Sequence, residues 1–439
     1  MTNFLRQQNI FKQNIHSRPE PESYFNQLLI LILPLLVVGY LMALGSVSSI
    51  ENAFASSLLL IGAFYLIKKQ FCFSRELKVL LGIGFALFVM VFLQALIGGK
   101  IEMLFKFQFA NLRNMLILPF ILAVIVNLKL SPQSLWRIIV LSGLYTFFYS
   151  ILVIVERPER GIGLLEEAIV IGNMGIMFSL MSLVAIFAIN GRYWKLLASV
   201  VFLSGLVLSV LSGTRAGWVA LLVTGCILLW VFYGQNRRYF LMTSFGFVLL
   251  TVLAVLFWNF LPIEQRILAA VNDLAMYSEG NSNSSIGARL DMWKIGLLAF
   301  TENPVFGWGV TPYKETFVAY LNNGIGNFNL VNGHTGYAQP HNDYVLVLYH
   351  FGIVGFGLVM SFILYPAFVF IKKMNQAKLK GNSEMVYVSL TGLVAIEVLL
   401  DFMMFNLAFM NKLFYVYIII VLMSLTILTL QEAQQHKKV

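Results

Sequence analysis

The sequence predicts an all-α integral membrane protein with about twelve transmembrane helices. Hydrophobic residues make up 59% of the 439 residues and charged residues 11%, whereas an ordinary soluble domain has about a quarter charged residues. The mean hydropathy is +0.81. Apolar runs of about 17 to 25 residues, the length that crosses a bilayer as a helix, recur along the chain. A soluble fold could not bury this much apolar surface.

Twelve apolar runs are expected to span the bilayer, and the second and fourth are the shortest. They lie near residues 28–45, 52–67, 77–97, 115–130, 135–155, 166–190, 195–212, 216–233, 240–260, 342–371, 385–405 and 412–430.

The positive charge is distributed as membrane topology requires. The formal net charge is +10, and most of the lysines and arginines fall in alternate short loops, which the positive-inside rule assigns to the cytoplasm. Both termini are then cytoplasmic, and residues 261–340 form a large periplasmic loop between spans nine and ten. The charge therefore indicates no nucleic-acid partner. With no internal repeat, residues 1–439 are interpreted as one polytopic domain that contacts membrane lipids.

The long loop has the pattern of an ordered segment. Leu290, Trp293, Leu297 and Phe300 recur at intervals of three or four and predict a helix over 289–300. Thr311-Pro312 can start a second helix.

Arg215 lies in S-G-T-R-A-G-W, between two spans and on the outer side. A guanidinium group binds phosphate through a planar fork and stays charged. The pattern is equally compatible with a headgroup-anchoring arginine. Arg289, at the start of the first loop helix, is either a second anion ligand or a solvated loop charge.

His341 follows Pro340 and precedes the tenth span. A helix is expected to start within a residue or two, with Asn342 or Asp343 as its cap. Histidine can accept a proton near neutral pH, so His341 is the candidate general base. The alternative is an interfacial histidine that bonds a neighbouring loop. His334 and His350 compete less well, because one lies in a glycine-rich run and the other well inside the span.

Other polar groups on the outer side are candidate substrate ligands. They are Arg160, Arg266, Lys294, Lys314 and Asn342. Arg160 has two acids beside it, which favours a plain solvated loop. Glu397 and Asp401 share one face of the eleventh span, as a structural pair or as a partner for an arginine.

The sequence indicates no cofactor. Neither metal-ligand spacing nor a phosphate-binding or dinucleotide-binding glycine loop is present, and Cys72 and Cys226 suggest no disulfide. A donor substrate would therefore have to arrive already activated.

These motifs resemble a known group of bacterial envelope proteins. The order S-G-T-R-A-G, then R-L-D-M-W-K with N-P-V-F-G-W-G, then H-N-D-Y ahead of F-G-I-V-G is similar to that of the O-antigen ligase and polymerase superfamily. One departure is His350, where many members carry a glutamate.

The resemblance implies a metal-independent, inverting glycosyltransferase of the bacterial inner membrane, with its active site facing the periplasm. Its donor would be an undecaprenyl-diphosphate-linked glycan, the O-antigen, and its acceptor a sugar hydroxyl of lipid A-core. The family's essential residues match Arg215, Arg289 and His341: the arginines would bind the diphosphate and the histidine would be the base. A nearby diphosphate would raise the pKa of the histidine and the arginines would lower it.

Three other functions fit the same residues. An O-antigen polymerase or a protein O-oligosaccharyltransferase would use the same donor with a different acceptor. A transporter of lipid-linked glycan would need no base, but the chain has no inverted repeat.

Overall fold

A computed structural model describes residues 35–37, 39–41, 48–68, 73–105, 109–156, 168–211, 216–256, 263–327 and 337–436. Within these ranges, the regular secondary structure is entirely helical, as the composition predicts. The protein is thus an all-α integral membrane protein.

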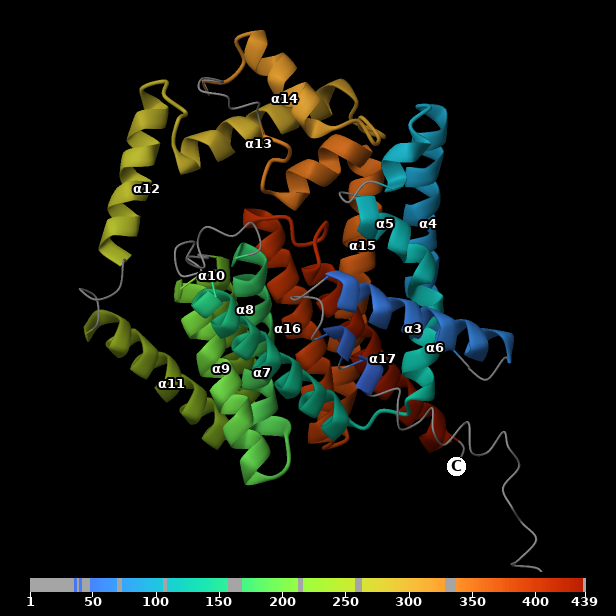
Figure 1. Ribbon diagram of the computed structural model, residues 1–439. Coiled ribbons are helices and arrows are strands. Elements are labelled where there is room, and N and C mark those ends of the chain that lie inside the picture. Colours follow the sequence, from blue (N-terminus) through green and yellow to red (C-terminus); the bar gives the residue numbers. More distant parts are fainter. Residues whose placement is uncertain are drawn as a thin grey trace, which may run out of the picture.

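Most of the helices run roughly side by side in one bundle, and a smaller group covers one end of it (Figure 1). The helices are α3 (Ser48–Ile67), α4 (Arg75–Ile97), η1 (Ile101–Phe105), α5 (Ala110–Arg113), η3 (Asn114–Ile117), α6 (Leu118–Asn127), α7 (Pro132–Glu156), α8 (Ala168–Ala188), α9 (Arg192–Leu211), α10 (Ala216–Tyr233), α11 (Arg237–Leu256), α12 (Ile263–Ser278), α13 (Ser285–Glu302), α14 (Tyr313–Asn322), α15 (Asp343–Leu379), α16 (Ser383–Phe405) and α17 (Leu413–His436).

Six helices in the described part of the chain are long and apolar enough to cross a bilayer, and four shorter apolar helices accompany them. Each lies within or overlaps one of the predicted runs. Two boundaries differ from the prediction. The run near 115–130 begins as a 3₁₀ turn before α6, and α15 continues past residue 371 to Leu379. The total of twelve spans stays a prediction, because the first run lies mostly outside the described residues.

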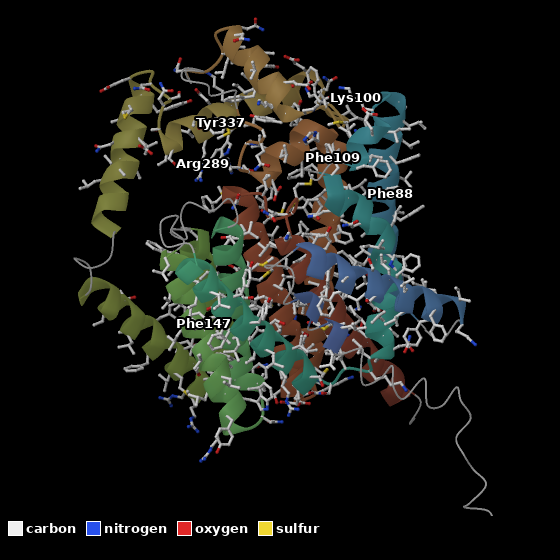
Figure 2. All side chains as sticks on the ribbon, in the orientation of Figure 1. Phe88, Lys100, Phe109, Phe147, Arg289 and Tyr337 are labelled. Atoms are coloured by element: carbon white, nitrogen blue, oxygen red, sulfur yellow. The ribbon has the colours of Figure 1, made fainter. Side chains whose placement is uncertain are left out.

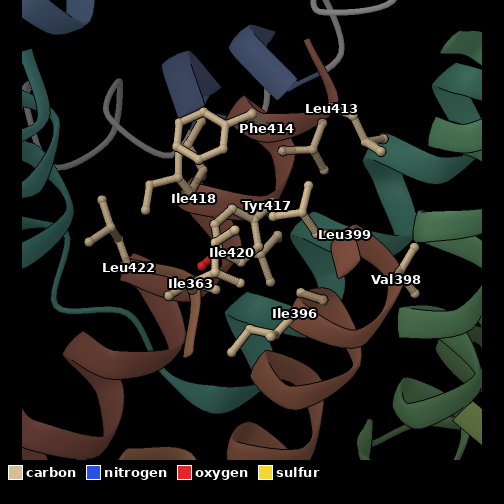
Figure 3. Packing of buried hydrophobic residues seen from close by; sticks show 14 of the residues in the cluster. Ile363, Ile396, Val398, Leu399, Leu413, Phe414, Tyr417, Ile418, Ile420 and Leu422 are labelled. Carbon is tan, nitrogen blue, oxygen red and sulfur yellow. The ribbon is translucent and has the colours of Figure 1, made fainter. Parts of the chain in front are cut away.

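The core of the bundle is formed where α15, α16 and α17 pack together. Figure 3 shows Ile363 of α15, Leu399 of α16 and Tyr417 of α17 meeting in this layer. Tyr417 and Leu399 are fully buried, and Ile363 is too. Burying a side chain of this size contributes about 1.5–3 kcal/mol. This packing therefore holds α15 in place, and with it the chain just before the helix, where His341 lies.

Three helices, α12, α13 and α14, form a cap over one end of the bundle (Figure 1). Helix α13 packs against α15, α12 and α14. The N-terminus of α13 is closed by Ser284, whose hydroxyl accepts from the Gly287 N–H at 3.0 Å, and by Asp273 of α12, whose carboxylate accepts from the Ile286 N–H at 3.2 Å. Both bonds satisfy amides that a helix leaves unpaired at its start. Helix α14 begins directly after Pro312, as predicted.

The helix predicted over 289–300 exists, and three of the four residues whose spacing predicted it, Leu290, Trp293 and Phe300, are half-buried. The buried positions are Ala288, Met292, Ile295 and Ala299, whereas Leu297 is 45% exposed. Small residues let the helix approach α15 closely. A Cβ atom added at Gly296 would lie 2.5 Å from a methyl group of Val345, so only glycine fits there.

Helix α15 is broken at Gly352, where φ is 60° and ψ is −163°. The turn 304–309 of the cap pairs with the backbone groups that the break exposes. The carbonyl groups of Pro304 and Val305 accept from Ile353 and Val354, at 2.9 and 3.2 Å. In the other direction, the N–H groups of Trp308 and Gly309 donate to the oxygens of Tyr349 and His350, at 2.8 and 2.7 Å. These bonds fasten the cap to α15 on both sides of the break, as buried backbone groups require.

Candidate functional site

His341 stands where the cap meets the bundle, two residues before α15 begins. Its φ is 49°, a left-handed conformation that residues other than glycine rarely adopt. Asn342 is the N-cap of the helix, and its side-chain oxygen accepts from the Val345 N–H at 3.2 Å. Strained residues of this kind persist only where their surroundings hold them.

The cap supplies one of these restraints. The indole Nε1–H of Trp293, on α13, donates to the main-chain oxygen of Pro340 at 2.9 Å. Pro340 is buried and directly precedes His341. The hydrogen bond therefore fixes the backbone immediately before the imidazole.

Arg289 lies one turn before Trp293 on α13, so the two side chains share a face of the helix. The positive charge of Arg289 acts on both His341 and Tyr337. Figure 2 labels Arg289 and Tyr337 at the end of the molecule where α13 lies. The ring of Tyr337 packs edge-on against Phe317 of α14, with 5.9 Å between the ring centroids. A guanidinium, a phenol and an imidazole thus gather at the junction of cap and bundle.

Asn406, the residue that ends α16, contacts the imidazole from the bundle side through a side-chain hydrogen bond. The turn that follows it is held by two buried groups. The carboxylate of Asp343 accepts from the Phe409 N–H at 2.6 Å, and the amide of Asn111 donates to the carbonyl oxygens of Phe409 and Asn411 at 2.6 and 2.9 Å. The partner of His341 is therefore anchored to both α15 and α5.

The surroundings of His341 favour the neutral imidazole. Burial lowers the pKa of His341 below its usual value of 6.5, and the charge of Arg289 lowers it further, while the hydrogen bond with Asn406 raises it. Both larger effects act against protonation. At neutral pH the imidazole can therefore accept a proton.

The structure describes only some of the site residues that the sequence predicts. Arg215 and Arg160 lie outside the described residues, and Arg266 is described only as backbone of α12. Lys294 is exposed on α13, away from the half-buried Arg289, and Lys314 is half-buried at the start of α14. Asn342 is 6% exposed, and its oxygen caps α15.

Trp293, Tyr337 and Asn406 were not predicted as parts of this cluster. Trp293 was assigned to an apolar face, and Asn406 is separated from His341 by two spans. Tyr337 could have been found by its place in G-Y-A-Q-P-H, four residues before the histidine.

Two other predicted groups lie within the bundle. His350 is 3% exposed and bonds the carbonyl oxygen of Gly309, so it belongs to the joint between α15 and the cap. Glu397 accepts from the Thr224 hydroxyl at 2.7 Å and also bonds Asp401. This agrees with a structural pair that links α16 to α10.

No three His, Cys, Asp or Glu side chains come together as a metal site would require, among the residues that the structure describes. The expectation of a reaction without metal stays a prediction. Cys226 lies exposed on α10 as a free thiol.

Comparison with known proteins gives two kinds of match. An uncharacterized protein of Haemophilus influenzae is 28% identical over 330 residues, which are 73% of this chain and 80% of the relative. The O-antigen ligase of Escherichia coli K12 is 36% identical over 96 residues, which are 21% of this chain and 22% of that protein.

Residues 198–360 match the model of a family described as O-antigen ligase. The matched stretch contains Arg215, Arg289 and His341 and runs through the break in α15. The chain therefore carries an O-antigen ligase domain at residues 198–360, and the resemblance to the O-antigen ligase superfamily predicted from its motifs is confirmed.

Proposed function

We propose that this membrane protein transfers an undecaprenyl-diphosphate-linked glycan to a sugar hydroxyl of lipid A-core, on the periplasmic side of the inner membrane. The observation that supports this most is the convergence of Arg289 and His341 inside the O-antigen ligase domain. A fixed cation beside a neutral imidazole suits a reaction that joins a phosphorylated donor to a hydroxyl acceptor.

The chemistry is a single displacement at the anomeric carbon. His341 takes the proton of the acceptor hydroxyl as its oxygen attacks this carbon. The bond between the carbon and the diphosphate oxygen breaks, and undecaprenyl diphosphate leaves with the electron pair. The new glycosidic bond has the inverted configuration, and the imidazolium later gives its proton to solvent.

The arginines bind the donor and stabilise the charge that grows on the leaving group. Arg289 would contact the diphosphate from the cap, and Arg215, which directly precedes α10 in the sequence, would be its second ligand. Lys294, Lys314 and Arg266 are proposed as weaker cationic contacts for the glycan or its diphosphate, and Arg160 is the least supported. Neither metal nor nucleotide is needed, so a chelator should leave the rate unchanged.

The lowered pKa of His341 determines whether the histidine can still act as a base when the diphosphate is bound. An arriving diphosphate raises the pKa of the histidine, whereas burial and Arg289 lower it. A free-protein pKa below the usual value leaves room for this rise. The histidine can thus remain a base after the donor binds.

O-antigen polymerase and protein O-oligosaccharyltransferase are the second candidates, because the same donor machinery serves all three enzymes. Transport without chemistry is less supported, since it gives no role to a neutral histidine beside Arg289.

Deleting the gene in its host and separating the lipopolysaccharide on a gel distinguishes these functions. Long glycan chains left on the lipid carrier, with bare core on the gel, indicate a ligase. Core capped by single repeat units would indicate a polymerase instead. Unchanged lipopolysaccharide together with underglycosylated envelope proteins would indicate the protein-directed enzyme.

A further inference from the structure

Trp293 lies between the proposed phosphate ligand and the proposed base. It follows Arg289 by one turn of α13, and its indole N–H reaches across the junction to the Pro340 oxygen, 2.9 Å away. The ring itself is half-buried and packs against the core. The same face of α13 therefore acts on His341 in two ways. The charge of Arg289 acts on the imidazole, and the Trp293 indole bonds the residue before it.

The conformation of His341 needs such a restraint. Its φ of 49° is a left-handed conformation that is unfavourable for an L residue. On one side the backbone is fixed by the Asn342 cap and α15. On the other side it is fixed by the bond between Trp293 and Pro340. Without the second restraint, the peptide before His341 is free to relax to a common conformation, and the imidazole would leave Arg289 and Asn406.

We propose that Trp293 is a positioning residue for the reaction: its hydrogen bond to Pro340 holds the His341 imidazole beside Arg289 and Asn406, where it can take the proton of the acceptor hydroxyl. This proposal rests on the proposed function, in which His341 is the base. It assigns no substrate contact to the indole.

Trp308 provides a matched control in the same cap. Its indole N–H also donates to a main-chain oxygen, that of Ala299, at 2.7 Å. Trp308 belongs to the turn that pairs with the break in α15, and its indole bond does not involve Pro340. Replacing either tryptophan by phenylalanine removes one donor and leaves an aromatic ring, but only Trp293→Phe releases the backbone before His341.

The test measures the pH dependence of transfer by the purified full-length protein in lipid nanodiscs, with lipid-linked donor and lipid A-core. Trp293→Phe should lower kcat about tenfold to a hundredfold, because a displacement near 1 Å can cost about a hundredfold. KM for the donor should change little. The acidic limb of the profile should move to higher pH, since an imidazole displaced into water regains its ordinary pKa. In Trp308→Phe the acidic limb of the pH profile should lie at the same pH as in the wild type.

A second measurement is independent of turnover. The rate at which diethyl pyrocarbonate modifies His341, followed by mass spectrometry across pH, reports the protonation of this one imidazole. Trp293→Phe should shift its midpoint upward. If that variant does not accumulate, Trp293→Tyr, which keeps a donor, should give a smaller shift in the same direction.

Wild-type kcat and an unmoved midpoint in Trp293→Phe would overturn the proposal. Equal shifts in both phenylalanine variants would do so too, since they would mean general loosening of the cap. If His341→Ala retains transfer while Trp293→Phe still moves the midpoint, the proposed function fails and the positioning of the histidine by Trp293 stands.

Discussion

The Nδ1 atom of His350 lies 2.7 Å from the main-chain oxygen of Gly309. A carbonyl oxygen only accepts, so the ring donates, and the bond joins the cap to α15 beside the break at Gly352. Phe109 packs edge-on against the same imidazole, with 5.1 Å between the centroids. A histidine inside an apolar span usually has a functional role. Here His350 instead helps to hold the cap against α15, near whose start His341 lies.

Gly352→Ala should weaken this joint. With φ of 60° and ψ of −163°, Gly352 lies in a backbone region that is essentially restricted to glycine and costs other residues of order 1–3 kcal/mol. A Cβ atom at this position would also lie 2.4 Å from the Val305 oxygen. We expect a lower apparent Tm of the protein in nanodiscs, followed by tryptophan fluorescence. Gly357→Ala is the control in the same helix, because nothing lies within 4 Å of its added Cβ, and alanine is favoured over glycine in a helix by about 0.5–1 kcal/mol. Equal effects of the two changes would contradict the structural role of the break.

Asp343→Ala should destabilise the turn that carries Asn406. The carboxylate is fully buried and accepts from the Phe409 N–H, and a buried donor left without a partner costs about 1–3 kcal/mol. Thermal unfolding measures the loss. Glu315→Ala removes another acid from the first turn of a helix, but an exposed one on α14, and should change the Tm little. If Asp343→Ala behaves like Glu315→Ala, the carboxylate does not hold the turn.

The charge at position 289 should set the pH at which His341 becomes active. The charge of Arg289 lowers the pKa of His341, and the base works only when neutral, so kcat/KM should rise with pH through a midpoint below the usual 6.5. Arg289→Gln removes the charge, which raises this pKa and moves the midpoint to higher pH. Arg289→Lys keeps the charge and the midpoint, while kcat/KM falls in both variants because the planar fork is lost. Identical midpoints in all three proteins would show that the charge of Arg289 does not act on the pKa of His341.

Arg215→Lys should impair donor use although the charge is kept. A hydrogen bond to a charged group contributes about 1.5–3 kcal/mol, so loss of the fork should reduce kcat/KM about tenfold to a hundredfold. Initial rates over a range of donor concentrations measure this. Arg237→Lys, the same change at an exposed arginine that begins α11, provides the comparison and should keep wild-type kinetics. Wild-type kinetics in Arg215→Lys would exclude a bidentate contact with the diphosphate.

Hydropathy and turn residues predicted most of the helices, including α13 and α14 of the cap. The close approach of α13 to α15 was not predicted, because periodicity gives weight to large residues such as Leu297, whereas Gly296 is the residue that lies against Val345 of α15. Small residues carry little hydropathy, yet they decide how closely two helices approach. The sequence pattern therefore located the helix and not its orientation.

The break in α15 could not be predicted from its own sequence. Gly352 lies in a continuous apolar run, where one glycine is tolerated in a helix at modest cost. The groups that satisfy the broken backbone come from the turn 304–309, so the break depends on a contact between distant segments. The contact of His341 with Asn406 is missed for the same reason, since it joins the ends of two helices. The motif that contains Arg289 did, however, point to the helix that lies beside the histidine.

The most direct test of the central claim is transfer by purified His341→Ala in nanodiscs, with lipid-linked glycan as donor and lipid A-core as acceptor. Loss of the base should reduce glycan transfer by about 10²–10⁴-fold, with donor binding and Tm retained. The wild type should release one undecaprenyl diphosphate for each glycan attached. Near wild-type transfer by His341→Ala would contradict the account.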